Sequence, residues 1–219
     1  MFRKLVLTAL ILMMLVPATG VAQEGADGLE QQSTKQMAFG KLSEKQQKLV
    51  VAMLKKLFKE GKVKAEESIR NNGSFVPYAY VSNHKGEGQF LHIDPEQQMR
   101  AEVAAHAVQK TIVTNALRGN LAASGLFMTS KMPQGVKEKA KQELADSIKG
   151  DRSIEDVRFL MVELQHLGGL GLLMSVPYWQ NDDGKWVFGS PISQQINPEL
   201  QATVQRIMRK AAKQQKSNG

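Results

Sequence analysis

The chain of 219 residues contains no cysteine, so it offers no disulfide, no lipidation site and no thiol chemistry. It also lacks any apolar run of membrane-spanning length beyond its first 22 residues. The hydrolase motif G-x-S-x-G and the zinc-protease motif H-E-x-x-H are both absent. These absences exclude several common enzyme classes, and they leave the stability of the fold to its hydrophobic core.

The amino terminus has the pattern of a cleaved export signal. Arg3 and Lys4 are followed by an apolar run over Leu5–Val16, then by Pro17 and the small residues Gly20–Ala22. A basic start, a short apolar run and small residues are typical of a signal peptide. We expect residues 1–22 to be removed and the protein to reach the bacterial periplasm, with secretion as the alternative.

Positive charge is concentrated towards the two ends of the chain. The formal net charge is +8, and loss of Arg3 and Lys4 with the signal lowers it to +6. Nine lysines lie in Lys35–Lys64, and five basic residues with no acid lie in Arg206–Lys216. Such basic surfaces favour weak contact with an anionic membrane surface and do not indicate specific nucleic-acid recognition.

The sequence predicts a disordered leader at residues 23–40 and a single α+β domain at 41–216. Ser43 and Gln46 have the spacing of a capping box, so a helix is expected to begin at Ser43. Gly61 is expected to end it, and a second short helix is expected over Ala65–Asn71. The apolar stripe of the first helix follows helical spacing: Leu49, Val50, Met53, Leu54, Leu57 and Phe58.

The segment Gly73–Asp94 predicts a β-hairpin. Aromatic and β-branched residues lead into Asn83–Gly86, which has the composition of a turn, and Gln89–Ile93 forms the returning strand. Asp94 and Pro95 then have the character of a helix start.

The rest of the chain alternates further helices and strands. Helices are expected at Pro95–Arg118, Val136–Ile148 and from Asn197, and strands at Leu121–Met132, Val157–His166, Leu170–Tyr178 and Lys185–Gly189. The short turns between strands predict an antiparallel sheet of five or six strands with packed helices. A profilin-like or GAF-like topology is compatible with this order.

The segment G-S-F-V-P-Y-A-Y-V, a polar glycine turn, and a late strand containing V-P-Y resemble a family of small uncharacterised bacterial α+β domains. The resemblance covers Ala65–Pro191 and implies the fold but no activity or catalytic residue.

Val-Pro-Tyr occurs at Val76–Tyr78 and again at Val176–Tyr178. Proline cannot donate to a strand ladder, so both segments are expected at bends or strand ends, at one end of the sheet. The aromatic side chains that follow are binding candidates if they are exposed, and core residues if they are not. The four candidates are Tyr78, Tyr80, Tyr178 and Trp179.

The histidines offer a weaker hypothesis. His84, His92, Asp94 and His166 could be brought together as a metal or catalytic site, but their spacing matches no known ligand motif. The sequence therefore predicts neither a metal nor another cofactor.

These observations favour an exported, non-enzymatic accessory or binding protein of the bacterial envelope, whose partner is a protein, an envelope component or a small ligand. Two alternatives stay open. One is a periplasmic enzyme with a site assembled from distant residues, and the other is peripheral membrane association through basic helices.

Overall fold

The computed structural model of the chain describes residues 42–93, 99–131 and 156–217. The predicted signal peptide (1–22), the leader (23–40) and the helix over Val136–Ile148 lie outside these ranges. So does Asp94, with the helix start predicted around it.

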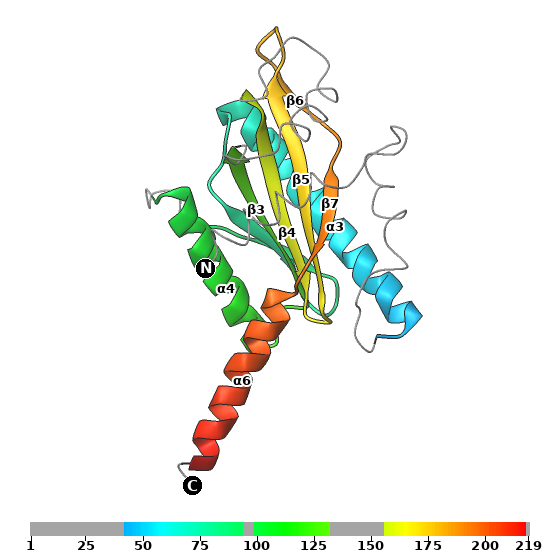
Figure 1. The fold of residues 1–219 in the computed structure, drawn as a ribbon, viewed down its shortest axis with the longest axis vertical. Coiled ribbons are helices and arrows are strands. Elements are labelled where there is room, and N and C mark those ends of the chain that lie inside the picture. The colour runs from blue at the N-terminus through cyan, green and yellow to red at the C-terminus, as the bar shows by residue number, and fades with distance from the viewer. Residues whose placement is uncertain (1–41, 94–98, 132–155, 218–219) are drawn as a thin grey trace.

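The α+β class and the antiparallel sheet are both confirmed. In the described residues, seven strands form one open sheet in the order β2-β1-β3-β4-β5-β6, with β7 pairing β5 beside β6. Figure 1 shows β4 and β5 as long central strands. The strands are β1 (Tyr78–Ser82), β2 (Gly88–Leu91), β3 (Ala123–Lys131), β4 (Arg158–His166), β5 (Leu170–Gln180), β6 (Trp186–Phe188) and β7 (Ile192–Ile196).

The sequence did not predict β7. Its residues I-S-Q-Q-I carry apolar side chains only at the two ends, and none of the five is fully buried. A strand with so little apolar alternation gives a weak sequence signal. What holds it in the sheet is its backbone pairing with β5, from Gly171 to Ser175.

One face of the sheet is covered by α3, which runs unbroken from Glu44 to Asn72. The capping box of Ser43 and Gln46 is confirmed, but the predicted stop at Gly61 is wrong. Gly61 is buried in mid-helix, and a Cβ there would lie only 2.0 Å from the Phe127 ring. Glycine is therefore needed here because it lets the helix approach the sheet. The helix ends at Gly73, whose φ is +71°.

The space between α3 and the sheet is an apolar core rich in aromatic rings. Tyr78 stacks on Phe127 with centroids 5.1 Å apart, and its hydroxyl donates to the Gly61 carbonyl at 2.7 Å. Val50, Leu54, Leu57 and Phe58 of the predicted stripe are buried here, whereas Leu49 is 61% exposed.

The other face carries α4 (Ala101–Leu117) and α6 (Glu199–Ser217). In the described residues α4 begins at Ala101, and Arg100, whose backbone is extended, is its N-cap; the predicted start at Pro95 lies outside them. Gly119, with φ +74°, follows soon after the end of α4. Four residues spaced by four bury one side of α4: Ala104, Val108, Ile112 and Ala116.

Other apolar side chains of α4 are not covered, since Val103 is 54% exposed and Leu117 is also exposed. The apolar side of the last helix, α6, is also only partly covered. Leu200 and Val204 pack against the sheet, but α6 then runs past its edge, so Ile207 and Met208 are exposed (Figure 1). No helix in the described part of the chain combines the length and the apolar character needed to cross a bilayer.

Candidate functional site

Buried polar side chains gather on the α4–α6 face of the sheet. Five polar or charged residues of the described chain are buried, and four of them lie on this face: Ser124, Glu163, Gln165 and Ser175. Alternation along β4 places Glu163 and Gln165 here, while Leu160, Val162 and Leu164 point to α3. A buried carboxyl is unusual in a core, so these side chains are candidates for a binding or catalytic role.

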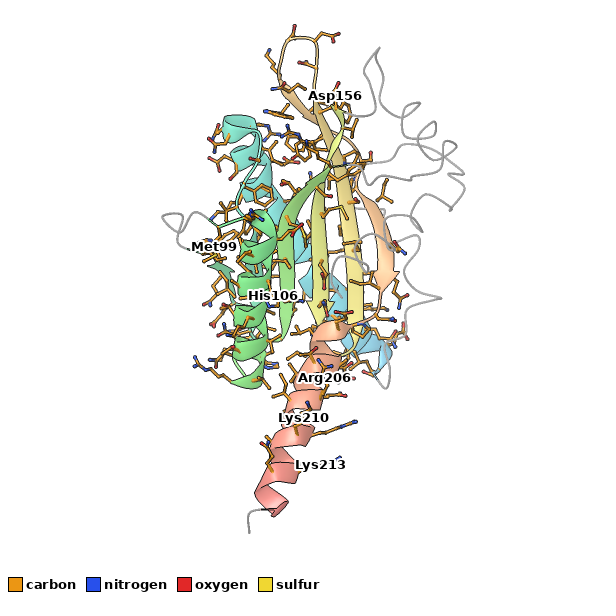
Figure 2. The ribbon with its side chains drawn as sticks, turned by 60° about the vertical axis from the view of Figure 1, so that its left-hand side comes forward. Met99, His106, Asp156, Arg206, Lys210 and Lys213 are labelled. Carbon is orange, nitrogen blue, oxygen red and sulfur yellow. The ribbon has the colours of Figure 1, made fainter. Side chains whose placement is uncertain are left out.

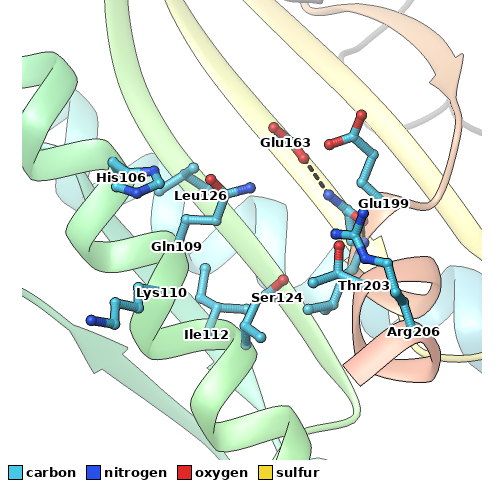
Figure 3. A pocket seen from close by; sticks show the side chains of 13 residues that line it. His106, Gln109, Lys110, Ile112, Ser124, Leu126, Glu163, Glu199, Thr203 and Arg206 are labelled. Carbon is cyan, nitrogen blue, oxygen red and sulfur yellow. Dashed lines mark hydrogen bonds between the residues drawn. The ribbon is translucent and has the colours of Figure 1, made fainter. Parts of the chain in front are cut away.

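A cavity of about 350 Å³ lies over three of these side chains, between α4, α6 and strands β3 and β4 (Figure 3). Helical spacing turns one side of each helix towards it. The sheet contributes Ser124, Leu126, Glu163 and Gln165; α4 contributes His106, Gln109, Lys110, Ile112 and Val113; α6 contributes Glu199, Leu200, Thr203 and Arg206. The lining therefore combines apolar side chains with hydrogen-bonding groups and charges of both signs.

A short hydrogen-bond chain connects the start of α6 with the buried carboxyl. The Leu200 backbone N–H donates to Gln165 Oε1 at 2.6 Å. The Gln165 side-chain amide in turn donates to Glu163 Oε1, as the dashed line in Figure 3 shows. Gln165 thus satisfies an amide of the first helical turn, which has no partner within the helix, and orients the carboxyl at the same time.

Glu163 is only 7% exposed. Burial raises the pKa of the Glu163 carboxyl, and the nearby Glu199 carboxylate raises it further, while the hydrogen bond from Gln165 acts in the opposite direction. A carboxyl in this setting holds its proton to higher pH than a free one and can then donate a hydrogen bond. A cation placed beside it would reverse the effect, because it would favour the ionised form.

The strand Val157–His166 was predicted, but Glu163 and Gln165 were not among the candidate residues, because most of that strand is a run of apolar residues. The signal was present in V-E-L-Q, where two polar residues two positions apart interrupt that run. Period two puts both side chains on one face of a strand, so a pair of polar residues in a central strand indicates a shared polar environment.

The aromatic candidates do not form one exposed patch. Tyr78, Tyr80 and Tyr178 are buried in the core beneath α3. The Tyr178 ring contacts Trp186 and Phe188, whereas Tyr78 contacts Phe75, Phe90 and Phe127. Trp179 is partly buried and lies with the small core cluster on the opposite face. A binding role for the four stays a prediction.

The structure does not bring the histidine candidates together. His84 follows β1 and His166 ends β4, near the same end of the sheet, whereas His92 follows β2 at the other end of the β1–β2 hairpin, level with the middle of β4. The His166 Nδ1 accepts from the Gly168 N–H at 2.8 Å, and burial lowers the pKa of His166, with His84 adding to the effect. Within the described residues, no three His, Asp or Glu side chains are grouped closely enough to hold a metal ion.

Comparison with known proteins gives no match among family models, curated proteins or solved structures. The resemblance to small bacterial α+β domains accordingly stays a prediction.

Proposed function

We propose that this chain is an exported binding protein of the bacterial periplasm that holds a small polar molecule between α4, α6 and the sheet. The single observation that carries the proposal is the buried Glu163 carboxyl in the wall of the 350 Å³ cavity. The export step rests on the amino-terminal sequence pattern.

The carboxyl also indicates the chemical class of the ligand. Burying an ionisable group costs free energy unless it is paired, and Glu163 and Glu199 stand near each other here. An ammonium group between them would satisfy both carboxylates by charge-assisted hydrogen bonds. We therefore expect a small molecule with a primary amine, whose carbon atoms contact the apolar side chains of Ile112 and Leu126.

Titration calorimetry with a panel of small primary amines, and with alcohols of the same carbon skeletons, tests this function. We expect one or more amines to bind and the matching alcohols to bind much more weakly. Glu163→Gln keeps the shape of the side chain but cannot ionise. It should weaken amine binding by at least about tenfold, the scale of one hydrogen bond to a charged group.

Ser175→Ala is the matched control. Ser175 is a buried polar residue on the same sheet face, but it does not line the cavity, and its hydroxyl contacts the Met161 sulfur. Binding should survive this change. An equal loss of amine affinity in both variants would contradict the assignment of the ligand site. So would an amine affinity that Glu163→Gln leaves unchanged.

One observation also favours a second function. Because the pKa of Glu163 is raised, the side chain can keep a proton and pass it to a bound molecule as a general acid. Mass spectrometry of each bound amine after incubation separates the two functions. A product formed by the wild type and absent with Glu163→Gln would assign catalysis, whereas unchanged amine supports binding alone.

A further inference from the structure

The part of α6 that extends beyond the sheet is exposed along its length. All residues from 205 to 214 are exposed, while Leu200 and Val204 of the preceding turns are buried. Figure 1 shows the helix continuing past the ends of the central strands. Because this segment is exposed, packing in the core does not explain its amphipathic sequence.

The apolar stripe of α6 does not stop where the core stops. Leu200, Val204, Ile207 and Ala211 follow one another at intervals of three and four, and Met208 lies four residues after Val204, so all five share one side of the helix. Ile207 is 37% exposed and Met208 is 60% exposed. The apolar side of the projecting segment is therefore open, and it continues directly from the side that packs against the sheet.

The remaining surface of the same segment is strongly basic. Residues 205–214 contain Arg206, Arg209, Lys210 and Lys213 and no acidic residue. Figure 2 shows Arg206, Lys210 and Lys213 spaced along the helix as it leaves the sheet. An apolar side combined with a lysine- and arginine-rich polar side is the pattern of helices that lie in the interface of anionic membranes.

We propose that residues 207–213 of α6 form a docking surface for a membrane that contains anionic lipid. Charge distinguishes between the two partners that could cover this surface, a second copy of the chain and a membrane. A second copy docked through this stripe would place two sets of four cations together with no acid in either segment, which is repulsive. Anionic headgroups neutralise the cations instead, and the stripe enters the boundary between headgroups and acyl chains.

The structure also separates the two basic helices of the chain. The lysine-rich α3 has most of its apolar stripe in the core, with Leu54 and Leu57 each only 1% exposed. It can offer charge to a membrane but little apolar surface. Docking is therefore assigned to α6, and it does not depend on a ligand in the cavity.

Cosedimentation with vesicles tests the proposal, using the chain expected after signal cleavage (residues 23–219). Vesicles of phosphatidylcholine mixed with phosphatidylglycerol are compared with vesicles of phosphatidylcholine alone. The variant Arg209→Gln/Lys210→Gln/Lys213→Gln should bind the anionic vesicles about a hundredfold more weakly, since each cation near an anionic surface contributes to affinity. Arg206 is left unchanged because it lines the cavity.

The control Lys45→Gln/Lys48→Gln/Lys59→Gln removes the same charge from exposed positions on α3. It should change binding only slightly. Equal loss in both triple variants would mean that net charge alone drives adsorption, and it would overturn the assignment to α6.

A second pair tests the apolar side. Met208→Ser should weaken binding to anionic vesicles by roughly tenfold, because a large apolar side chain no longer enters the interface. Leu49→Ser, an equally exposed change on α3, should have no effect. Every altered side chain is exposed, so thermal melts should match the wild type. A dimer in sedimentation velocity that Met208→Ser abolishes would assign the stripe to a second copy and refute membrane docking.

Discussion

The two faces of the sheet are built from different chemistry. Beneath α3 the core is apolar and aromatic, and the Tyr78 hydroxyl within it is bonded to the Gly61 carbonyl. Beneath α4 and α6 the sheet presents Glu163 and Gln165 to a cavity. The same strands supply both faces, because alternate residues of β4 point in opposite directions. The α3 face is suited to stability, whereas the α4–α6 face contains a buried carboxyl, which lowers stability.

The largest effect is expected on the α3 face, at the contact between Gly61 and Phe127. Phe127→Ala should lower the free energy of unfolding by about 3–5 kcal/mol, as large-to-small aromatic changes in cores do. Gly61→Ala should cost about 1–3 kcal/mol or more, because its Cβ would overlap the ring. Chemical denaturation of the single variants measures both costs.

The double variant sharpens this prediction. With the Phe127 ring removed, adding a methyl group at Gly61 should cost little, so the two effects should be strongly non-additive. If the costs of the two single variants simply add in the double variant, Gly61 is needed for a reason other than close approach to the ring.

Two adjacent residues of β5 allow a direct comparison of the two faces. Tyr178 is fully buried towards α3, and Trp179 is partly buried towards the other face. Tyr178→Ala should cost about 3–5 kcal/mol, and Trp179→Ala about 1 kcal/mol. Thermal melts of the two variants measure both costs. A larger cost at Trp179 would contradict the assignment of the α3 face as the one that contributes more to stability.

A smaller effect is expected at Gln165. Gln165→Leu leaves the buried Leu200 N–H without its acceptor, which should cost about 1–3 kcal/mol. Hydrogen exchange of the Leu200 amide should accelerate, since the first turn of α6 loses its anchor on the sheet. Ser124→Ala, also in the cavity wall, should leave that exchange rate unchanged.

The sequence was sufficient to predict the elements whose backbone conformation depends on neighbouring residues alone. The capping box at Ser43 and the turn around Gly86, whose φ is +81°, needed only neighbouring residues to be recognised. Gly61 was misread because the advantage of a glycine there comes from Phe127, far away in the chain. Local propensity cannot report a tertiary contact of this kind.

The candidate site was missed for a related reason. Glu163 and Gln165 carried a usable signal in their spacing, but the cavity exists only because α4 and α6 pack over them. The helix predicted from Asn197 carries an apolar stripe that continues through Ala211. Where the helix leaves the sheet, however, the stripe at Ile207 and Met208 is exposed, and helical periodicity alone cannot locate that edge.

The smallest change in stability is expected from Glu163→Gln, and its direction depends on pH. The raised pKa of Glu163 means that the folded state favours the protonated form. Its contribution to stability is therefore full below the ordinary glutamate pKa of about 4.3 and is lost as pH rises through the raised value. Glu163→Gln should be more stable than the wild type at neutral pH and equally stable at about pH 4. Denaturation at both pH values tests this, and a pH-independent difference would contradict it.

The most direct test of a ligand-binding α4–α6 face is an NMR titration of the Glu163 carboxyl carbon, assigned with Glu163→Gln. We expect its pKa to lie above that of a free glutamate in the empty protein and to fall when the small amine found by calorimetry is added. A carboxyl that titrates at the ordinary value, or one whose pKa does not respond to the bound amine, would contradict the account.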